Sequence, residues 1–177
     1  MSQNKRLASG GRIDRKKVIN FSFDGKSYKG FEGDTLASAL LANGVDIIAR
    51  SFKYSRPRGI TGHGSEEPNG VIQLGTGAST IPNVRATQQE LYAGLVANPV
   101  AGWPSVNFDL MATLGKAGAM MPPGFYYKTF MYPQKLWMTY EHFIRKAAGL
   151  GKAPTAPDPD TYDKINHHCD VMIVGAG

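Results

Sequence analysis

The chain has 177 residues, of which 42% are hydrophobic and 10% aromatic, so it can bury the core of one or two domains. The formal net charge is +6, and the single cysteine excludes an internal disulfide and any zinc or iron–sulfur site held by several thiolates of this chain. The first twenty residues lack the apolar core of a signal peptide, and the longest uncharged stretch is interrupted by proline and glycine, so we expect a cytoplasmic protein without membrane contact.

The N-terminal residues form a basic segment. Its positive charges are Lys5, Arg6, Arg12, Arg15, Lys16 and Lys17. We predict a flexible basic arm over residues 1–16, either solvated or lying across a partner subunit. Such an arm can bind nucleic acid or an acidic lipid surface, but no aromatic residues alternate with these charges to stack on bases. We therefore expect no nucleic-acid partner, and a salt-dependent binding assay with the arm deleted would test the alternative.

Residues 17–80 have the pattern of a small β-grasp domain. The stretch "KVINFSFDGKSYKGFEG" alternates apolar and polar residues around Asp24-Gly25, which predicts a hairpin. "GDTLASALLANG" follows, which predicts a helix capped by Asp34 or Thr35 and ended by Gly44. Short strands at "VDIIAR" and "VIQL" enclose a long loop. The order of strand, strand, helix, strand, loop and strand predicts an α+β fold.

Residues 81–154 are expected to form a connecting helical or irregular segment that packs on a domain or subunit. "ATQQELYAGLVAN" predicts one helix, and "WMTYEHFIRKAAGLGK" predicts a second that ends near Gly149. Between them, residues 111–137 are rich in methionine and aromatic residues without a regular period. This stretch could line a cofactor groove, but we favour an interface. Residues 155–168 are a linker by composition.

Residues 169–177, "CDVMIVGAG", contain an apolar run that leads into Gly-x-Gly. This is the first half of a dinucleotide-binding fingerprint, so we predict the first strand of a Rossmann-like domain with Gly175, Ala176 and Gly177 as cofactor-binding residues. The third glycine and the helix that would hold the pyrophosphate do not follow, so we expect a truncated chain in which these residues cannot bind a dinucleotide. A short edge strand with a flexible end is the alternative.

The long loop of residues 51–70 and the residue before it contain a cluster of basic side chains. Its members are Arg50, Lys53, Arg56 and Arg58. They could contact the phosphate of a flavin or nucleotide, or acidic groups of a partner. We favour scaffolding or subunit contact, with the arginines tied to Glu66 and Glu67.

The histidines and the cysteine do not make a catalytic or metal site in the sequence. His63 lies between two glycines, which orient a catalytic base poorly. His167 and His168 precede Cys169 but lack a further zinc ligand at a suitable spacing, and we expect all three at the entry to a buried strand. We predict no catalytic residue and no metal ligand in this chain.

Several segments together resemble a known family. "GDTLASALLANGV", "RSFKYSRPRGITGHGSEEPNGVIQL", "ATQQELYAGL", "GWPSVNFD" and "CDVMIVGAG" are similar in order and spacing to the N-terminal region of the α subunit of heterotetrameric sarcosine oxidase. The resemblance runs from about residue 10 to the end. It implies oxidative demethylation of sarcosine to glycine with hydrogen peroxide by the complete enzyme, with transfer of the one-carbon unit to tetrahydrofolate. The implied partners are the β, γ and δ subunits.

The resemblance also implies cofactors: NAD in the complete α subunit, FAD and FMN in the complex, and tetrahydrofolate as acceptor. The first domain of the family resembles a 2Fe-2S ferredoxin, whose cluster needs cysteines in the long loop. The loop of residues 51–70 has none, so we expect a cluster-less domain. Because the sequence offers no nucleophile, base or metal site, we also expect the fragment to be inactive alone. A subunit of a related opine, proline or amine dehydrogenase, or a free-standing interaction module, remains the alternative.

Overall fold

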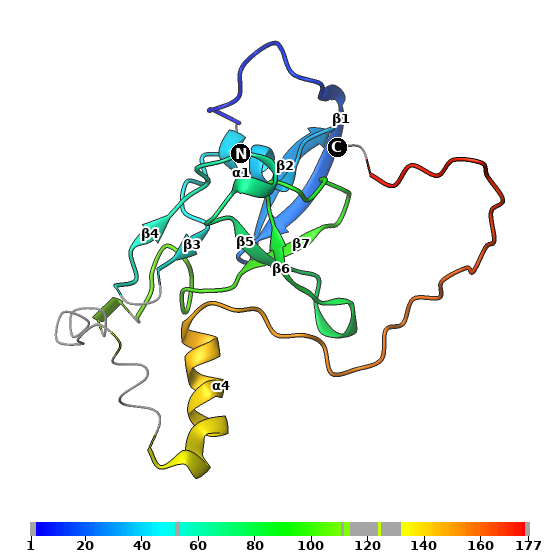
Figure 1. The fold of residues 1–177 in the computed structure, drawn as a ribbon. Coiled ribbons are helices and arrows are strands. Elements are labelled where there is room, and N and C mark those ends of the chain that lie inside the picture. Colours follow the sequence, from blue (N-terminus) through cyan, green and yellow to red (C-terminus); the bar gives the residue numbers. More distant parts are fainter. Residues whose placement is uncertain (1–2, 52–53, 111, 114–123, 125–131, 176–177) are drawn as a thin grey trace.

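The computed structural model describes residues 3–51, 54–110, 112–113, 124 and 132–175 (Figure 1). The strands in this part of the chain are β1 (Asp14–Phe23), β2 (Lys26–Glu32), β3 (Ala49–Arg50), β4 (Pro57–Arg58), β5 (Val71–Leu74), β6 (Ile81–Arg85) and β7 (Val96–Pro99). The α helices are α1 (Leu36–Ala42) and α4 (Trp137–Ala147). Short 3₁₀ turns are η1 (Gly64–Glu66), η2 (Gly77–Ser79) and η4 (Gln134–Leu136). No helix of the described residues is long and apolar enough to cross a membrane.

Five strands form one mixed sheet in the order β2-β1-β7-β5-β6 (Figure 1). β1 pairs antiparallel with β2 and parallel with β7, whereas β5 pairs antiparallel with both β7 and β6. β3 and β4 make a separate two-stranded ribbon. A mixed sheet with few helices confirms the expected α+β fold class. Strands β6 and β7 lie beyond residue 80, where the sequence placed the end of this domain.

The β1–β2 hairpin forms because its turn residues accept a left-handed backbone. Asp24 and Gly25 have φ of 51° and 73°, as a tight two-residue hairpin turn requires. Phe21 and Phe23 alternate with exposed or half-buried polar residues and point into the core. The hairpin therefore buries one face of β1 against the rest of the domain, as the alternating sequence predicts.

Helix α1 packs its apolar face into the same core. Thr35 is its N-cap, where the Thr35 side chain accepts a hydrogen bond from the Ser38 N–H and the Ser38 hydroxyl accepts one from the Thr35 N–H. Leu36 and Leu40 are completely buried. The core cluster consists of Phe21, Phe23, Leu36, Ala37, Ala39, Leu40, Ile48, Ile72, Leu74, Ala86, Leu91, Leu95, Ala97 and Val106. The predicted helix is confirmed.

The basic segment contacts the domain. The Arg6 guanidinium pairs with Asp34, and the Lys5 ammonium pairs with Asp46. β1 begins at Asp14, inside the range predicted as an arm. The predicted arm of residues 1–16 therefore contacts the domain at Lys5 and Arg6, while its flexibility stays a prediction.

The helix predicted for "ATQQELYAGLVAN" is wrong. The segment forms turns and then β7, which fills the gap between β1 and β5. Leu91 and Leu95 are buried in the core from this turn-rich path rather than from a helical stripe. The sheet hydrogen bonds available to β7 on both sides outweigh the helical preference of its sequence.

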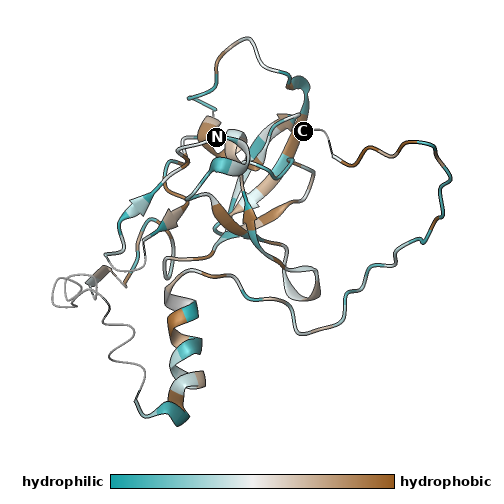
Figure 2. Ribbon diagram, viewed as in Figure 1, coloured by the Kyte–Doolittle hydropathy of each residue, from teal (hydrophilic) through white to brown (hydrophobic). Residues whose placement is uncertain are grey.

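The second predicted helix is confirmed as α4, and Gly149 follows it with φ of 72°. In Figure 1 α4 lies apart from the five-stranded sheet, and Figure 2 shows hydrophobic and hydrophilic residues alternating along it. Met138 and Phe143 on this helix are 73% and 66% exposed. The methionine- and aromatic-rich stretch between residues 111 and 131 lies largely outside the described residues.

The predicted terminal strand does not form over residues 169–175. This segment is irregular, and Val171, Met172, Ile173 and Val174 are exposed. Figure 1 shows it as an extended path that no labelled strand accompanies. A strand is stable only when its backbone N–H and C=O groups pair with a neighbouring strand. Residues 169–175 have no such neighbour in the described part of the chain, so they do not form a strand. A Rossmann-like domain is therefore not confirmed.

Candidate functional site in the loop after β3

A buried carboxylate lies at the centre of the long loop. Glu67 is fully buried, and its two carboxylate oxygens accept four backbone hydrogen bonds. The N–H groups of Thr61 and Gly62 donate to Oε2, the first at 2.7 Å. The N–H groups of Asn69 and Gly70 donate to Oε1 at 2.7 and 3.1 Å. The loop is thus wrapped around one side chain.

The surroundings of Glu67 keep its carboxyl group charged. Burial raises the pKa of Glu67, but the hydrogen bonds from four backbone N–H groups lower it, and the net pKa lies below the usual value. The carboxylate is therefore an anion at neutral pH, held in a concavity of N–H groups. Gly70 packs closely on the Glu67 side chain, because a Cβ on Gly70 would lie 2.9 Å from the Cγ of Glu67.

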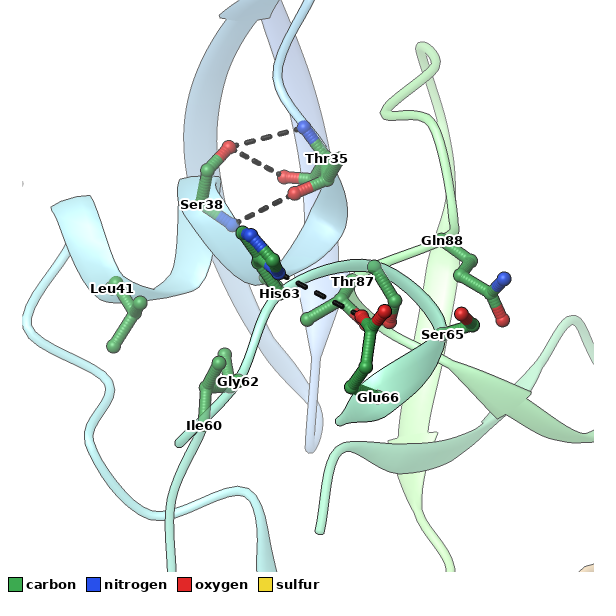
Figure 3. Close-up of a pocket in the computed structure, with 12 residues that line it drawn as sticks. Thr35, Ser38, Leu41, Ile60, Gly62, His63, Ser65, Glu66, Thr87 and Gln88 are labelled. Carbon is green, nitrogen blue, oxygen red and sulfur yellow. Dashed lines mark hydrogen bonds and ion pairs between the residues drawn. The ribbon is translucent and has the colours of Figure 1, made fainter. Parts of the chain in front are cut away.

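An open depression of about 730 Å³ lies beside this loop, lined by the first turn of α1, the loop around His63 and the segment at Thr87 (Figure 3). The His63 side chain is 99% exposed and its Nδ1 lies 3.7 Å from a carboxylate oxygen of Glu66. Thr87 donates a hydrogen bond to the carbonyl of Gly64 at 2.6 Å. An exposed imidazole with one exposed partner is not held in a fixed orientation, so this depression offers weak support for acid–base chemistry.

Arg50 is a scaffold residue, but it does not pair with a glutamate. Its guanidinium donates to the carbonyls of Val106 at 2.7 Å, Ser55 at 2.9 Å and Asn107 at 3.2 Å. It therefore joins the β3–β4 ribbon to a segment more than fifty residues later. The expected pairing of the loop arginines with Glu66 and Glu67 is wrong, because backbone groups satisfy Glu67.

The other basic residues of the cluster lie at the surface. The Arg56 guanidinium lies 4.9 Å from the centre of the Tyr54 ring, and both Arg56 and Arg58 are exposed. Neither arginine forms an ion pair with any residue of the described ranges. Lys53 lies outside the described residues. Arg56 and Arg58 therefore place two positive charges in solvent at the β4 side of the β3–β4 ribbon.

Residues 103–110, which we name the 103–110 loop, present apolar side chains on a fixed backbone. Asp109 accepts hydrogen bonds from the Trp103 N–H at 3.0 Å and from the Ser55 hydroxyl, and the Leu110 N–H donates to the Trp103 carbonyl at 2.8 Å. Yet Trp103, Phe108 and Leu110 are 62%, 64% and 42% exposed. Sequence reasoning treated "GWPSVNFD" only as part of a resemblance. The signal in the sequence was the close spacing of Trp103 and Phe108 among turn-forming residues, which indicates exposed aromatic side chains.

Of the three residues predicted to bind a cofactor, the structure describes only Gly175, so their role stays a prediction. Gly175 has φ of 92° and open space around its α-carbon, while Ala176 and Gly177 lie outside the described residues. The expected strand-entry position of His167, His168 and Cys169 is wrong, since these residues are exposed in the irregular terminal segment. No group of three or more potential metal ligands occurs in the part of the chain that the structure describes.

Comparisons with known proteins match most of the chain. Residues 16–101 match the model of a 2Fe-2S iron-sulfur cluster binding domain. The chain is 53% identical over 173 residues to sarcosine oxidase subunit alpha of Rhizobium meliloti (strain 1021), which covers 97% of this chain and 18% of the relative. It is 32% identical over 181 residues to sarcosine oxidase subunit alpha of Corynebacterium sp. (strain U-96), covering all of this chain and 14% of that relative.

The predicted resemblance to the α subunit of sarcosine oxidase is thereby confirmed, and the chain spans less than a fifth of the length of these curated relatives. Among solved structures, an L-proline dehydrogenase from P. horikoshii matches with a TM-score of 0.36 and 23% identity. That match covers 48% of this chain and 16% of the dehydrogenase chain.

The family match corrects the cofactor prediction. We expected NAD, FAD, FMN and tetrahydrofolate without an iron–sulfur cluster, whereas the matching family is described as binding a 2Fe-2S cluster. The residues present do not fit that group either. A cluster of this type needs four protein ligands, usually cysteine thiolates, and the chain has only Cys169, exposed in the terminal segment. None of these cofactors is therefore assigned to this chain.

Proposed function

We propose that this chain is the N-terminal portion of the α subunit of a sarcosine oxidase complex. The complete complex would convert sarcosine to glycine with formation of hydrogen peroxide in the cytoplasm. Identity of 53% over nearly the whole chain to such a subunit supports this proposal. The α subunit would assemble with β, γ and δ subunits.

Within that complex, we assign this portion an assembly role and expect it to be inactive alone. The observation behind this assignment is the 103–110 loop, in which a hydrogen-bonded backbone holds Trp103 and Phe108 in solvent. Large aromatic residues with ordered backbones contribute much of the binding energy at protein interfaces. Water contact of these side chains is unfavourable, so covering them stabilises an assembly.

The neighbouring charges define the chemistry of the partner. Arg50 fixes the loop to the β3–β4 ribbon, so Arg56 and Arg58 lie on the element that the loop packs against. We therefore propose that the loop docks into an apolar pocket with an acidic rim on another subunit. Burial of the aromatic side chains would supply affinity, and the two arginines would select the partner by charge.

A chimeric α subunit tests this function. The portion of the Rhizobium meliloti α subunit that matches this chain is replaced by residues 1–177 and produced together with the β, γ and δ subunits. The proposal expects an assembled complex that forms hydrogen peroxide from sarcosine. The isolated chain, as control, is expected to form none. A chimera that folds but neither assembles nor oxidises sarcosine would contradict the proposal.

A further inference from the structure

Residues 61–70 connect β4 to β5, and the group that holds this loop in shape differs from the one that the family description names. The matching family is named for a 2Fe-2S cluster, yet this chain lacks the ligands for one. The loop nevertheless has four backbone N–H groups that converge on one buried carboxylate. We propose that residues 61–70 form an anion-binding site and that the Glu67 carboxylate is its built-in ligand, in the structural place of an external cluster.

The direction of the N–H groups is the first argument. Concavities of successive backbone N–H groups bind anions, including phosphates and iron–sulfur clusters. Here two donors meet each oxygen of Glu67, so all four are satisfied by one side chain. Without the carboxylate these donors would lose their shared acceptor, and the loop would lose the group that fixes its shape.

The Glu67 side chain is packed closely by the glycines around it. A methyl group at Gly70 would crowd the Cγ of Glu67, and one at Gly62 would lie 3.4 Å from its Cα. The backbone of Glu67 is also fixed, because Arg85 of β6 donates to its carbonyl at 3.2 Å. The Glu67 side chain and backbone are therefore both held closely by their surroundings.

The neighbouring glutamate provides a matched control. Glu66 has a side chain that is 71% exposed and forms an ion pair with His63, whereas Glu67 is fully buried. Both residues have the same chemistry and adjacent positions. A difference between their variants therefore reports the anion site rather than the general effect of removing a negative charge.

The test uses the full chain with Glu67→Ala, and acetate and acetamide as probes. Acetate replaces the lost carboxylate, while acetamide has the same shape without charge. The unfolding temperature of the Glu67→Ala variant should fall by about 10 °C and recover in acetate but not in acetamide. The wild type and Glu66→Ala should respond to neither probe. Equal effects of the two probes, or equal stability of the two alanine variants, would overturn the proposal.

Two further measurements cover a variant that fails to fold. Glu67→Gln retains the shape but not the charge, and should unfold at a lower temperature than Glu66→Gln; equal temperatures would overturn the proposal. Anaerobic incubation of the wild-type chain with iron and sulfide should leave it without the visible absorption of a 2Fe-2S cluster. Appearance of that absorption would show that Glu67 does not take the place of the cluster.

Discussion

Arg6 and Asp34 form a two-pronged ion pair that joins the N-terminal segment to the residue before the N-cap of α1. The guanidinium Nη1 lies 3.0 Å from Oδ1 and Nη2 lies 2.6 Å from Oδ2. Asp34 is 1% exposed, and the guanidinium also lies 4.9 Å from the centre of the Phe31 ring. Parallel hydrogen bonds of this kind combine charge with fixed geometry. Arg6 is therefore part of the folded domain.

Replacing Arg6 by alanine should destabilise the domain strongly, because it leaves the Asp34 carboxylate buried without its cation. Breaking one side of a buried pair costs about 3–5 kcal/mol in the free energy of unfolding. Lys5→Ala is the matched control, since the Lys5–Asp46 pair is about half exposed on both sides and such pairs contribute about 0–1 kcal/mol. Urea unfolding of both variants measures the difference. Similar losses for Lys5→Ala and Arg6→Ala would contradict the assignment.

The lowered pKa of Glu67 predicts that acid reduces the folding stability of the domain. Its folded-state pKa lies below the usual 4.5, because backbone hydrogen bonds outweigh the opposing effect of burial. A lowered folded pKa adds stability that is complete above the unfolded pKa and disappears as the pH falls through the folded pKa. The stability difference between wild type and Glu67→Gln should thus be constant near pH 7 and shrink below about pH 4.5. Urea unfolding across this range checks it; a difference that is independent of pH would argue against an ionised Glu67.

Gly75 and Gly77 lie in one turn and differ in surroundings. Both have positive φ, 67° and 60°, but a Cβ on Gly75 would collide with the backbone carbonyl of Ser79, whereas one on Gly77 meets open space. Gly77→Ala should therefore cost about 1 kcal/mol of conformational strain. Gly75→Ala should cost clearly more, because a backbone atom cannot move aside cheaply. Thermal unfolding ranks the two variants, and equal losses would show that the contact at Gly75 is relieved by small shifts.

Hydrogen bonds from Arg50 hold the 103–110 loop in place. Alanine at this position removes donors to the Val106, Asn107 and Ser55 carbonyls, which should raise amide hydrogen exchange in the 103–110 loop about tenfold or more. Arg58→Ala is the control, because Arg58 is exposed on β4 and forms no ion pair within the described ranges. Exchange of the loop that stays at the wild-type rate in Arg50→Ala would mean that Asp109 alone is sufficient.

The sequence predicts the elements whose signals are local. The Asp24-Gly25 turn, the Thr35 cap and the apolar residues Leu36 and Leu40 of α1 act within a few residues, and the structure confirms them. β7 could not be found in this way, because its state is decided by strands β1 and β5, more than twenty residues away. Local helix preference therefore predicts a helix over residues 86–98, where the structure has turns and β7.

The site was predictable only in part for the same reason. The basic cluster around Arg50 was visible as a pattern, but its acceptors are backbone carbonyls of a distant loop, which no spacing reveals. The sequence predicts Glu67 as a partner for the loop arginines, because charged residues are seldom buried without an opposite charge. Here backbone N–H groups stabilise the carboxylate instead, and only the folded loop brings them together.

The docking role of the 103–110 loop is the central claim, and one comparison tests it most directly. A chimeric α subunit with Trp103→Ser and Phe108→Ser is compared with one that has Ile81→Ser, an equally exposed apolar residue on β6. Assembly with the other subunits is measured by analytical ultracentrifugation. We expect the double variant to assemble at least about tenfold more weakly while its unfolding temperature is unchanged, because interface aromatics dominate binding. Assembly as strong as that of Ile81→Ser would contradict the account.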